Sequence, residues 1–512
     1  MRRLSVLDAA WLTVESKETP MHVGSLQIYS LPENAPSDYV QKMVDQLRSA
    51  KSFAPPWNLQ IKPSPLSKAM PAVRERHDVD MEYHVRHSAL PRPGGERELG
   101  ELISRLHARG LDLTRPLWEC HLIEGLEGNR IALYTKMHHA LVDGVGGVRI
   151  MQQALGKSAD ERVPPPWSRR PMPKKKPRGS SGGAPLAGNL NGWLSELLKS
   201  TRGEIKTLPE LAKTFGEFVK AARQDDDPLG VPYRAPKSVI NSRVTPPRRF
   251  ATQQYSIERL KKLAAAAEVT LNDVVLGLCG SSLRRFLLES NALPNQALTA
   301  GIPVSVRPAG DNSVGTAISF IIATLGTDIA DPKLRLETIH ESTRRAKENL
   351  QKLPRSAIDR YSLMLMGPFI LQLITGLGGR TRPVFNVTIS NVPGPDYPLF
   401  YNGLKMEGIY PVSLLSHGQS LNITCLSYDG NLNFGFTACR DTLPKMQRLS
   451  VYTGEALEEL EEIYGLRKPA KPRPARRKAA TTRKAPAAKP KTAKTKPKAA
   501  TGKTTTRRRT KA

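Results

Sequence analysis

A chain of 512 residues is longer than one ordinary core, so we expect two domains or one large bilobed unit. Apolar residues make up 39 %, enough for a globular body, and a net charge of +30 indicates an anionic partner such as nucleic acid, a membrane surface or a phosphorylated substrate. The 4 cysteines form no CxxC or CxxH pair, which predicts a reduced, intracellular protein.

The N-terminal region, residues 1–159, is expected to form a first lobe of alternating strands and helices. Asp8 and Glu15 interrupt any signal-peptide core at its start. Farther on, "RIALYTKM" (130–137) predicts a strand that runs directly into "HHALVDGVGG", and "VRIMQQAL" (148–155) predicts a short helix. The histidines therefore lie in a strand-to-helix turn, a position that presents side chains to a cleft.

Residues 160–208 predict a linker rich in Pro, Gly and basic residues. Its "RRPMPKKKPR" run is typical of a solvated linker, although it also suits anionic lipid head groups. The following stretch, residues 209–224, predicts an amphipathic helix whose apolar face suits either core packing or a membrane surface.

A second α/β lobe is expected within residues 209–466. Helices are predicted at 256–269 and 271–290, period-two strands at 386–392, 421–428 and 432–439, and a Glu-rich helix around 443–463. No uncharged apolar run reaches transmembrane length. The closest run, 361–379, is broken by Gly367, Pro368 and Gln372, which predicts a buried helix pair or, alternatively, a membrane-touching segment.

The chain ends in a basic tail, residues 467–512. It holds 19 Lys and Arg and no Asp or Glu, which accounts for 19 of the 30 net positive charges. Its Lys, Pro, Ala and Thr composition cannot bury a core, so we expect it to be disordered and to bind polyanions or anionic lipid.

The turn that contains His138, His139 and Asp143 carries the clearest chemistry. A neutral imidazole, with a reference pKa near ~6.5, accepts a proton at working pH, and a nearby carboxylate can hold its tautomer. Glycines let the backbone turn sharply beside a bulky substrate. The alternative is a purely structural role, with an ordinary Asp-Gly turn beside two histidines that take no part in catalysis. A metal site is disfavoured because no ligand-spaced cluster surrounds these residues, and His84 and His87 have the pattern of a surface strand.

"HHALVDG" fits the HHxxxDG motif of the coenzyme A-dependent acyltransferase superfamily. Other stretches resemble the bacterial wax ester synthase/acyl-CoA:diacylglycerol acyltransferase family and occur in its order over residues 1–464. They are "LSVLDAAWLTVES", "TPMHVGSLQIY", "YHVRHSALPRPGG", "LDLTRPLWE", "LNDVVLG", "IPVSVRP", "ISNVPGP" and "GIYPVSLLSHGQSLNITCLSYDGNLNFGF".

This resemblance implies an α/β fold of two chloramphenicol-acetyltransferase-like lobes with a substrate channel between them, followed by the disordered tail. It implies that His139 is the general base for the acceptor hydroxyl and that His138 shapes the site. Asp143 is expected to hold the turn through an ion pair with Arg307. Gly144 is expected to leave room for the acyl chain or pantetheine.

Three outer motifs are expected to bind substrate, each with a structural alternative. Pro116, Leu117 and Trp118 resemble the family's PLW motif, where Trp118 is either a channel wall or a core residue. Asn272 and Asp273 match its ND motif, yet Thr270 with Asp273 is also a helix capping box. Ser390 and Asn391 suit contacts to the oxyanion or coenzyme, or a plain turn. In "SVGTAISF" Thr316 stands where the family often has Asn, which puts local acceptor contacts in doubt.

The resemblance therefore implies transfer of a long-chain acyl group from acyl-CoA to diacylglycerol or a long-chain alcohol. Acyl-CoA is expected as a co-substrate, with no metal or other cofactor. The protein is expected in the cytoplasm, peripherally associated with the inner membrane or lipid inclusions. Two rivals remain: a superfamily acyltransferase with a carrier-protein donor or polar acceptor, and a noncatalytic lipid-inclusion or nucleic-acid-tethering protein.

Overall fold

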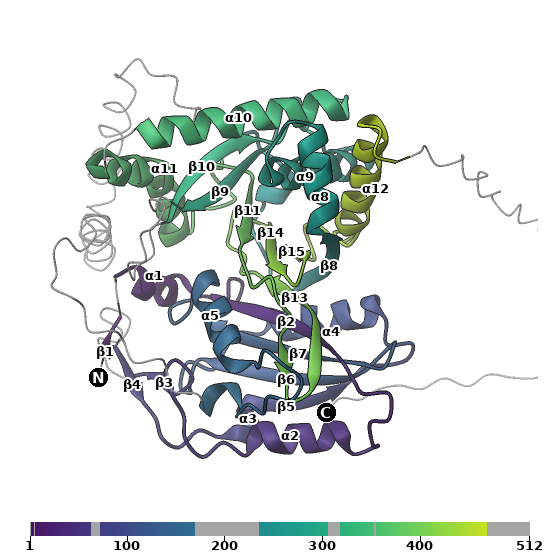
Figure 1. Ribbon diagram of the computed structural model, residues 1–512. Helices are drawn as coiled ribbons and strands as arrows, with labels where there is room; N and C mark the ends of the chain where they lie inside the picture. The colour runs from purple at the N-terminus through teal and green to yellow at the C-terminus, as the bar shows by residue number, and fades with distance from the viewer. Residues whose placement is uncertain are drawn as a thin grey trace, which may run out of the picture. The chain divides into compact units, whose positions relative to one another are not determined.

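The computed structural model describes residues 2–4, 6–62, 72–168, 235–305, 318–352 and 355–467. Several predictions lie outside these ranges: most of the linker, the amphipathic helix at 209–224, Arg307, Thr316 and the tail beyond residue 467. Two six-stranded mixed sheets organise what is described, each with its own helices (Figure 1). The predicted two-lobed α/β fold is confirmed.

The first sheet carries the turn with the two histidines. Its strand order is β12 (Phe400–Tyr401), β13 (Leu404–Val412), β2 (His22–Ser30), β7 (Arg130–His138), β6 (Trp118–Leu126) and β5 (Val85–Ala89). The helices of this part are α1 (Val6–Val14), α2 (Tyr39–Arg48), α3 (Met81–His84), α4 (Glu96–Ala108) and α5 (Gly144–Ala154). A small sheet of β1 (Arg2–Arg3), β4 (Ala72–Glu75) and β3 (Leu59–Ile61) lies in the same lobe.

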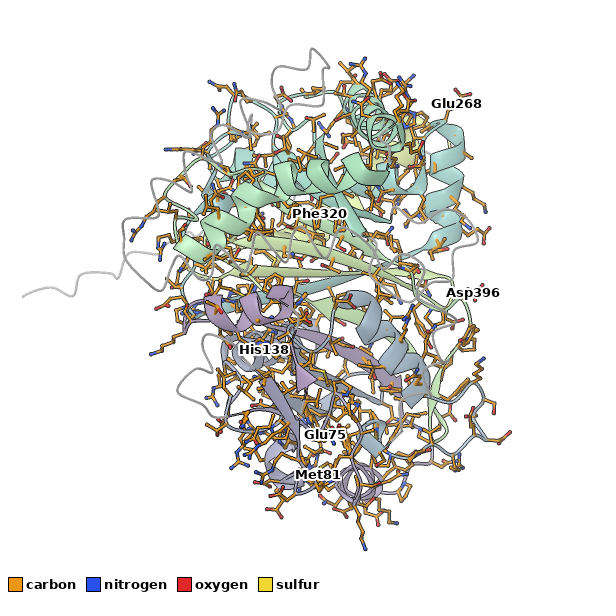
Figure 2. The ribbon with its side chains drawn as sticks, turned by 90° about the vertical axis from the view of Figure 1, so that its left-hand side faces the viewer. Glu75, Met81, His138, Glu268, Phe320 and Asp396 are labelled. Carbon is orange, nitrogen blue, oxygen red and sulfur yellow. The ribbon has the colours of Figure 1, made fainter. Side chains whose placement is uncertain are left out.

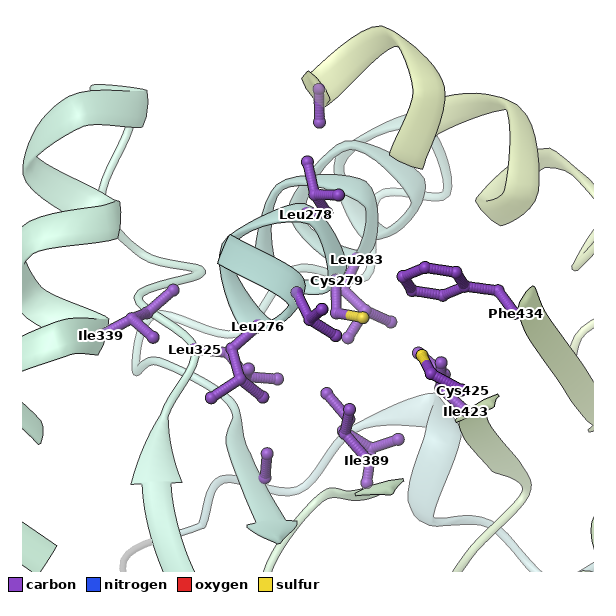
Figure 3. Close-up of a cluster of buried hydrophobic side chains, with 14 of the residues drawn as sticks. Leu276, Leu278, Cys279, Leu283, Leu325, Ile339, Ile389, Ile423, Cys425 and Phe434 are labelled. Atoms are coloured by element: carbon purple, nitrogen blue, oxygen red, sulfur yellow. The ribbon is translucent and has the colours of Figure 1, made fainter. Parts of the chain in front are cut away.

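The second sheet has the order β10 (Ile318–Thr324), β9 (Thr299–Ser305), β11 (Val387–Val392), β14 (Leu421–Tyr428), β15 (Asn431–Cys439) and β8 (Arg248–Ser256). Its helices are α8 (Ile257–Ala266), α9 (Leu271–Glu289), α10 (Pro332–Lys352), α11 (Arg355–Thr375) and α12 (Arg448–Ile463). Figure 3 shows its core, where Cys279 and Leu283 of α9 face Ile423, Cys425 and Phe434 of the sheet. All four cysteines are buried.

Two strands leave the second half of the chain and complete the first sheet. The light-green β13 runs antiparallel beside the purple β2, with Val412 opposite Gly24 (Figure 1). This crossing passes so close to β15 that a Cβ on Gly435 would lie 1.8 Å from the carbonyl oxygen of Pro411, so only glycine fits there. The predicted division of the chain near residues 160 and 209 did not foresee this exchange of strands.

The apolar run at 361–379 differs from its prediction. A break into two helices was expected at Gly367 and Pro368, but α11 continues through both residues as one helix. Proline removes one intrahelical hydrogen bond without necessarily ending a helix that neighbouring elements support. No single helix in the described ranges is long and apolar enough to span a membrane, although the bent pair α8–α9 passes by length and composition.

Candidate active site

The candidate active site lies at the end of β7. The strand forms because buried apolar residues dominate it from Ile131 to Met137, and it pairs along its length with β2, so that His138 stands opposite His22. Figure 2 shows His138 beneath α1, where the two lobes meet. The chain then turns and enters α5 at Gly144, which confirms the predicted strand-to-helix turn.

The His138 ring is fully committed to holding the turn. Its Nδ1 accepts a hydrogen bond from the Ala140 N–H at 3.1 Å, so its proton resides on Nε2. That nitrogen donates to Glu15 Oε2 at 3.1 Å, and the side chain has no exposed surface. Because both ring nitrogens are engaged, His138 is suited to position the loop and not to accept a substrate proton.

Glu15 was not singled out from the sequence. It follows α1, and its Oε1 accepts a hydrogen bond from the Met21 N–H at 3.4 Å, while the Met21 carbonyl accepts one from the His139 N–H at 2.8 Å. Glu15 thus holds both histidines, one through its ring and one through the backbone of Met21. No local pattern signals this role, because the two segments are more than a hundred residues apart in the chain.

The His139 ring differs from its neighbour in having an unengaged nitrogen. Nδ1 is buried and has no hydrogen-bond partner among the described residues. No described partner therefore locks the ring in one tautomer, and the neutral imidazole keeps a lone pair for a substrate proton.

Burial lowers the pKa of His139 to about 4, although the Asp143 carboxylate opposes this by favouring the charged ring. The imidazole is therefore neutral at pH 7 and able to accept a proton. Trp11 of α1 packs against the ring, with 4.5 Å between ring centroids and a tilt of 42°. Trp11 is a second contact that the sequence did not single out, although it lies in a stretch that carried the family resemblance.

Asp143 caps α5. Its Oδ1 accepts a hydrogen bond from the Gly146 N–H at 2.6 Å, which satisfies one of the free donors at the helix start. Its predicted partner Arg307 lies outside the described residues, so the ion pair stays a prediction. A Cβ added to the exposed Gly144 would lie 3.6 Å from Val392 of β11, so the two lobes approach each other closely here.

The close contact between Gly144 and Val392 places residues 390–392 ("SNV") beside the histidine turn. Ser390 and Asn391 lie on β11, paired in parallel with Thr424 and Cys425 of β14, and both are half-buried. They immediately precede Val392. Their predicted contacts to substrate remain predictions, but their place beside the histidine turn is the one that such contacts require.

The three residues of the PLW motif are buried next to the histidine turn. The Leu117 carbonyl accepts a hydrogen bond from the His138 N–H at 3.0 Å. Trp118 is fully buried, stacks on His84 at 4.5 Å and on Trp167 at 4.8 Å, and its Nε1 donates to the Trp57 carbonyl. Pro116 is also buried. This packing matches the structural alternative for Trp118, a core residue. It also corrects the surface-strand prediction for His84, which is buried at the end of α3.

Asp273 lies in the second lobe and is fully buried at the start of α9. Its Oδ2 accepts hydrogen bonds from the Thr270 N–H and hydroxyl and from His340 Nδ1, and its Oδ1 accepts one from Thr343. The predicted capping box is confirmed. Both carboxylate oxygens of Asp273 are therefore already hydrogen-bonded within the protein. Asn272 beside it is half-buried. A substrate role for the pair stays a prediction.

Among the described residues no group of three or more His, Cys, Asp or Glu side chains has the arrangement of a metal site. The polar groups of the turn instead form a base and its supports. The arrangement suits proton removal from a hydroxyl by His139 at the seam between two lobes.

We expect Glu15→Gln to lower kcat at least tenfold with little change in KM for the acyl donor. The amide keeps the side-chain volume but replaces the charged acceptor of His138 Nε2–H, and charge-assisted hydrogen bonds are roughly twice as strong as neutral ones. Steady-state kinetics and a melting curve would check this. Glu33→Gln, at an exposed position far from the turn, serves as the matched control. An unchanged kcat in a folded Glu15→Gln protein would contradict the positioning role.

Replacing Asp143 by alanine is expected to lower both activity and melting temperature. The helix cap alone contributes about 1 kcal/mol, and its loss frees the turn that holds His139. Asp143→Asn separates cap from charge, since an amide oxygen can still accept from Gly146 N–H. Full activity and an unchanged melting temperature in Asp143→Asn would show that the predicted ion pair has no role.

Similarity to known proteins extends over most of the chain. A family model described as the wax ester synthase/diacylglycerol acyltransferase catalytic domain matches residues 4–275, and the C-terminal domain model of the same family matches residues 314–461. A Mycobacterium tuberculosis protein provisionally named diacylglycerol O-acyltransferase is 43 % identical over 487 residues, which cover 91 % of this chain and 98 % of that protein. The O-acyltransferase WSD of Acinetobacter baylyi is 37 % identical over 465 residues, 90 % of this chain and 98 % of its own length.

Solved structures give the same result. The wax ester synthase/diacylglycerol acyltransferase of Marinobacter aquaeolei is 36 % identical and superposes with a TM-score of 0.73, covering 91 % of this chain and 100 % of that one. The first condensation domain of the CDA synthetase, 15 % identical with a TM-score of 0.50 over 90 % of this chain and 94 % of its own, shares the fold.

Proposed function

Because this chain belongs to the wax ester synthase/diacylglycerol acyltransferase family, we propose that it transfers a long-chain acyl group from acyl-CoA to diacylglycerol or a long-chain alcohol. The observation that carries the proposal is His139: a neutral ring with a free nitrogen, held by Met21 and Trp11 in a turn that meets the second lobe. Direct transfer of an acyl group to an alcohol needs a base of this kind to remove the hydroxyl proton.

The reaction is a direct transfer. His139 takes the acceptor's hydroxyl proton while the oxygen attacks the thioester carbonyl, which forms a tetrahedral oxyanion. Collapse of this intermediate breaks the C–S bond and releases coenzyme A thiolate, a good leaving group because a thiol has a pKa near ~8.5. The proton then passes from His139 to solvent or to the thiolate. The buried cysteines take no part.

Support for the oxyanion is proposed from Ser390 and Asn391, which lie at the seam beside the turn. Acyl-CoA is proposed as a co-substrate, with no metal or other bound cofactor. We also place the enzyme in the cytoplasm, peripherally on the inner membrane or on lipid inclusions. Unchanged turnover after dialysis against EDTA would support the absence of a metal.

A thiol-release assay with palmitoyl-CoA and a panel of acceptors tests the proposal. Rapid release with diacylglycerol or a long-chain alcohol, and the matching ester by thin-layer chromatography, is the expected result. Release only with polar acceptors, or only from a carrier-protein thioester, would favour the first rival. An absence of release with every acceptor, from a folded protein, would favour the noncatalytic rival.

Removal of the basic tail after Leu466 is expected to leave turnover on micellar substrate nearly unchanged at moderate salt. The tail carries dense positive charge, so its loss should reduce co-sedimentation with DNA or anionic vesicles at low salt, where counterion release is most favourable. Sedimentation over a salt series checks the binding. A truncated protein that folds but no longer turns over would show that the tail belongs to the catalytic body.

A further inference from the structure

The second half of helix α11 is largely apolar yet not fully covered. In its second half the apolar residues spread around more than half of the helix circumference: they are Leu365, Met366, Phe369, Ile370, Leu371, Leu373 and Ile374. A helix of this kind is normally buried on every side. Here Leu365 is buried, but the other six keep part of their surface exposed, and Leu377 just beyond the helix is 38 % exposed.

This helix lies beside α1 (Figure 1). Trp11 of α1 contacts the His139 ring at 4.5 Å, and Glu15 at the end of α1 holds the histidine turn. The half-exposed apolar surface is therefore only one helix away from the catalytic base. A lipid acceptor that leaves a bilayer must find such a route, because its hydroxyl is scarcely present in water.

Arginines surround the end of α11. Arg243, Arg380 and Arg382 are exposed, and Arg243 donates to the Gly376 carbonyl at 2.8 Å. Among the described residues no carboxylate pairs with Arg243 or Arg380, and Glu18 is the acidic residue that faces this region, through His417. Exposed apolar side chains beside arginines suit the headgroup region of an anionic bilayer, because apolar contact and positive charge both favour binding there.

We propose that α11, with the arginines at its end, docks on an anionic phospholipid surface and passes the lipid acceptor from it, past α1, to His139. The occupant is the bilayer itself, because apolar contact and positive charge are presented together. This inference rests on the proposed function and assigns the surface through which its acceptor enters. The basic tail increases the time spent at the surface but does not select this face.

The first test measures contact directly. Because all four native cysteines are buried, a single introduced cysteine can be labelled selectively. We expect a dye on Leu377→Cys in the full chain to be quenched by lipid-borne nitroxides in vesicles of phosphatidylcholine and phosphatidylglycerol. A dye on Leu334→Cys, at a 53 % exposed position on α10, is the matched control and should not respond.

Three outcomes would overturn the proposal. Equal quenching at both positions would show that this face is not selected. A dye signal at Leu377→Cys that changes with protein concentration in the absence of lipid would show that a second copy covers the face. Failure of Leu377→Cys to react with the dye in the folded protein would show that the chain itself covers it.

The second test separates docking from catalysis. Leu377→Glu and Arg380→Glu should each raise the apparent KM for vesicle-embedded diacylglycerol about tenfold or more, since each removes attraction to the bilayer. Their turnover with a water-soluble short-chain alcohol should stay at the wild-type level. Leu334→Glu and Arg97→Glu, exposed on α10 and α4, are matched controls that should change neither rate.

If the two variants lose activity with both acceptors, or with neither, the docking surface is wrong. If wild-type protein transfers no acyl group to any acceptor, the proposed function fails, whereas the quenching result still decides whether the face binds lipid. The two failures are therefore distinguishable.

Discussion

Replacing His139 with alanine is expected to abolish acyl transfer in a protein that remains folded. General-base catalysis typically contributes ~10²–10⁴-fold, and no other group at this turn has a free nitrogen lone pair among the described residues. His138 cannot substitute, because its Nδ1 accepts from Ala140 and its Nε2 donates to Glu15. The measurement is single-turnover release of coenzyme A from palmitoyl-CoA with diacylglycerol.

The matched control is His87→Ala, because His87 lies on β5 in the same lobe, is exposed and pairs with Glu124 at the surface. It should retain wild-type turnover. Binding of acyl-CoA to His139→Ala, measured by calorimetry, should persist, since the ring acts on the acceptor. Near wild-type turnover by a folded His139→Ala protein would falsify the mechanism.

We expect the protein to unfold in mild acid, at a pH well above the range in which carboxylates titrate. Burial lowers the pKa of His84 and His139 to about 4 and that of His107 to about 3, and it also lowers those of His22 and His121. The unfolded chain binds protons at these rings near pH ~6.5, while the folded chain does not. The stability that these neutral histidines contribute is therefore fully present above pH ~6.5, and it is lost as the pH falls toward their folded pKa values.

The size of this effect follows from proton linkage. Each histidine with a strongly lowered pKa reduces the free energy of unfolding by about 1 kcal/mol at pH 5.5, and by more at lower pH. Several together remove much of the typical 5–15 kcal/mol that stabilises a domain. Glu119 does not contribute to the pH dependence of stability in this range. Its contact with His121 and its ion pair with Lys136 hold its pKa near 2, despite burial. Melting temperatures measured from pH 7.5 to 4.5 should fall steeply below pH 6.

A matched pair of variants tests this explanation. Both ring nitrogens of the neutral His107 are used: Nε2 donates to the Ser413 carbonyl and Nδ1 accepts from the Tyr134 hydroxyl. His107→Gln should therefore lower stability at pH 7.5 but flatten its dependence on pH. His87→Gln, at an exposed position on β5, should leave the slope unchanged. A melting temperature independent of pH between 7.5 and 5 would show that the buried histidines do not control acid stability.

Local sequence was sufficient to predict the strand-to-helix turn that contains His138 and His139. The strand content of 130–137, the adjacent histidines, the capping aspartate and the glycines all act within one strand and one helix start, so their spacing predicts their geometry. The capping box at Thr270 and Asp273 was equally readable, because both partners lie within one helical turn. The ordered motifs likewise predicted two lobes, since they span nearly the whole chain.

Tertiary structure alone decided which groups support that turn. Trp11 of α1 and Glu15 just after it reach His139 and His138, and β13 pairs with β2 from nearly four hundred residues away. Trp118 is a core residue and not an exposed wall because Trp57, Trp167 and His84 enclose it. Hydrogen bonds and ring contacts between distant segments leave no periodic trace in the sequence, because they depend on where the folded backbone brings those segments together.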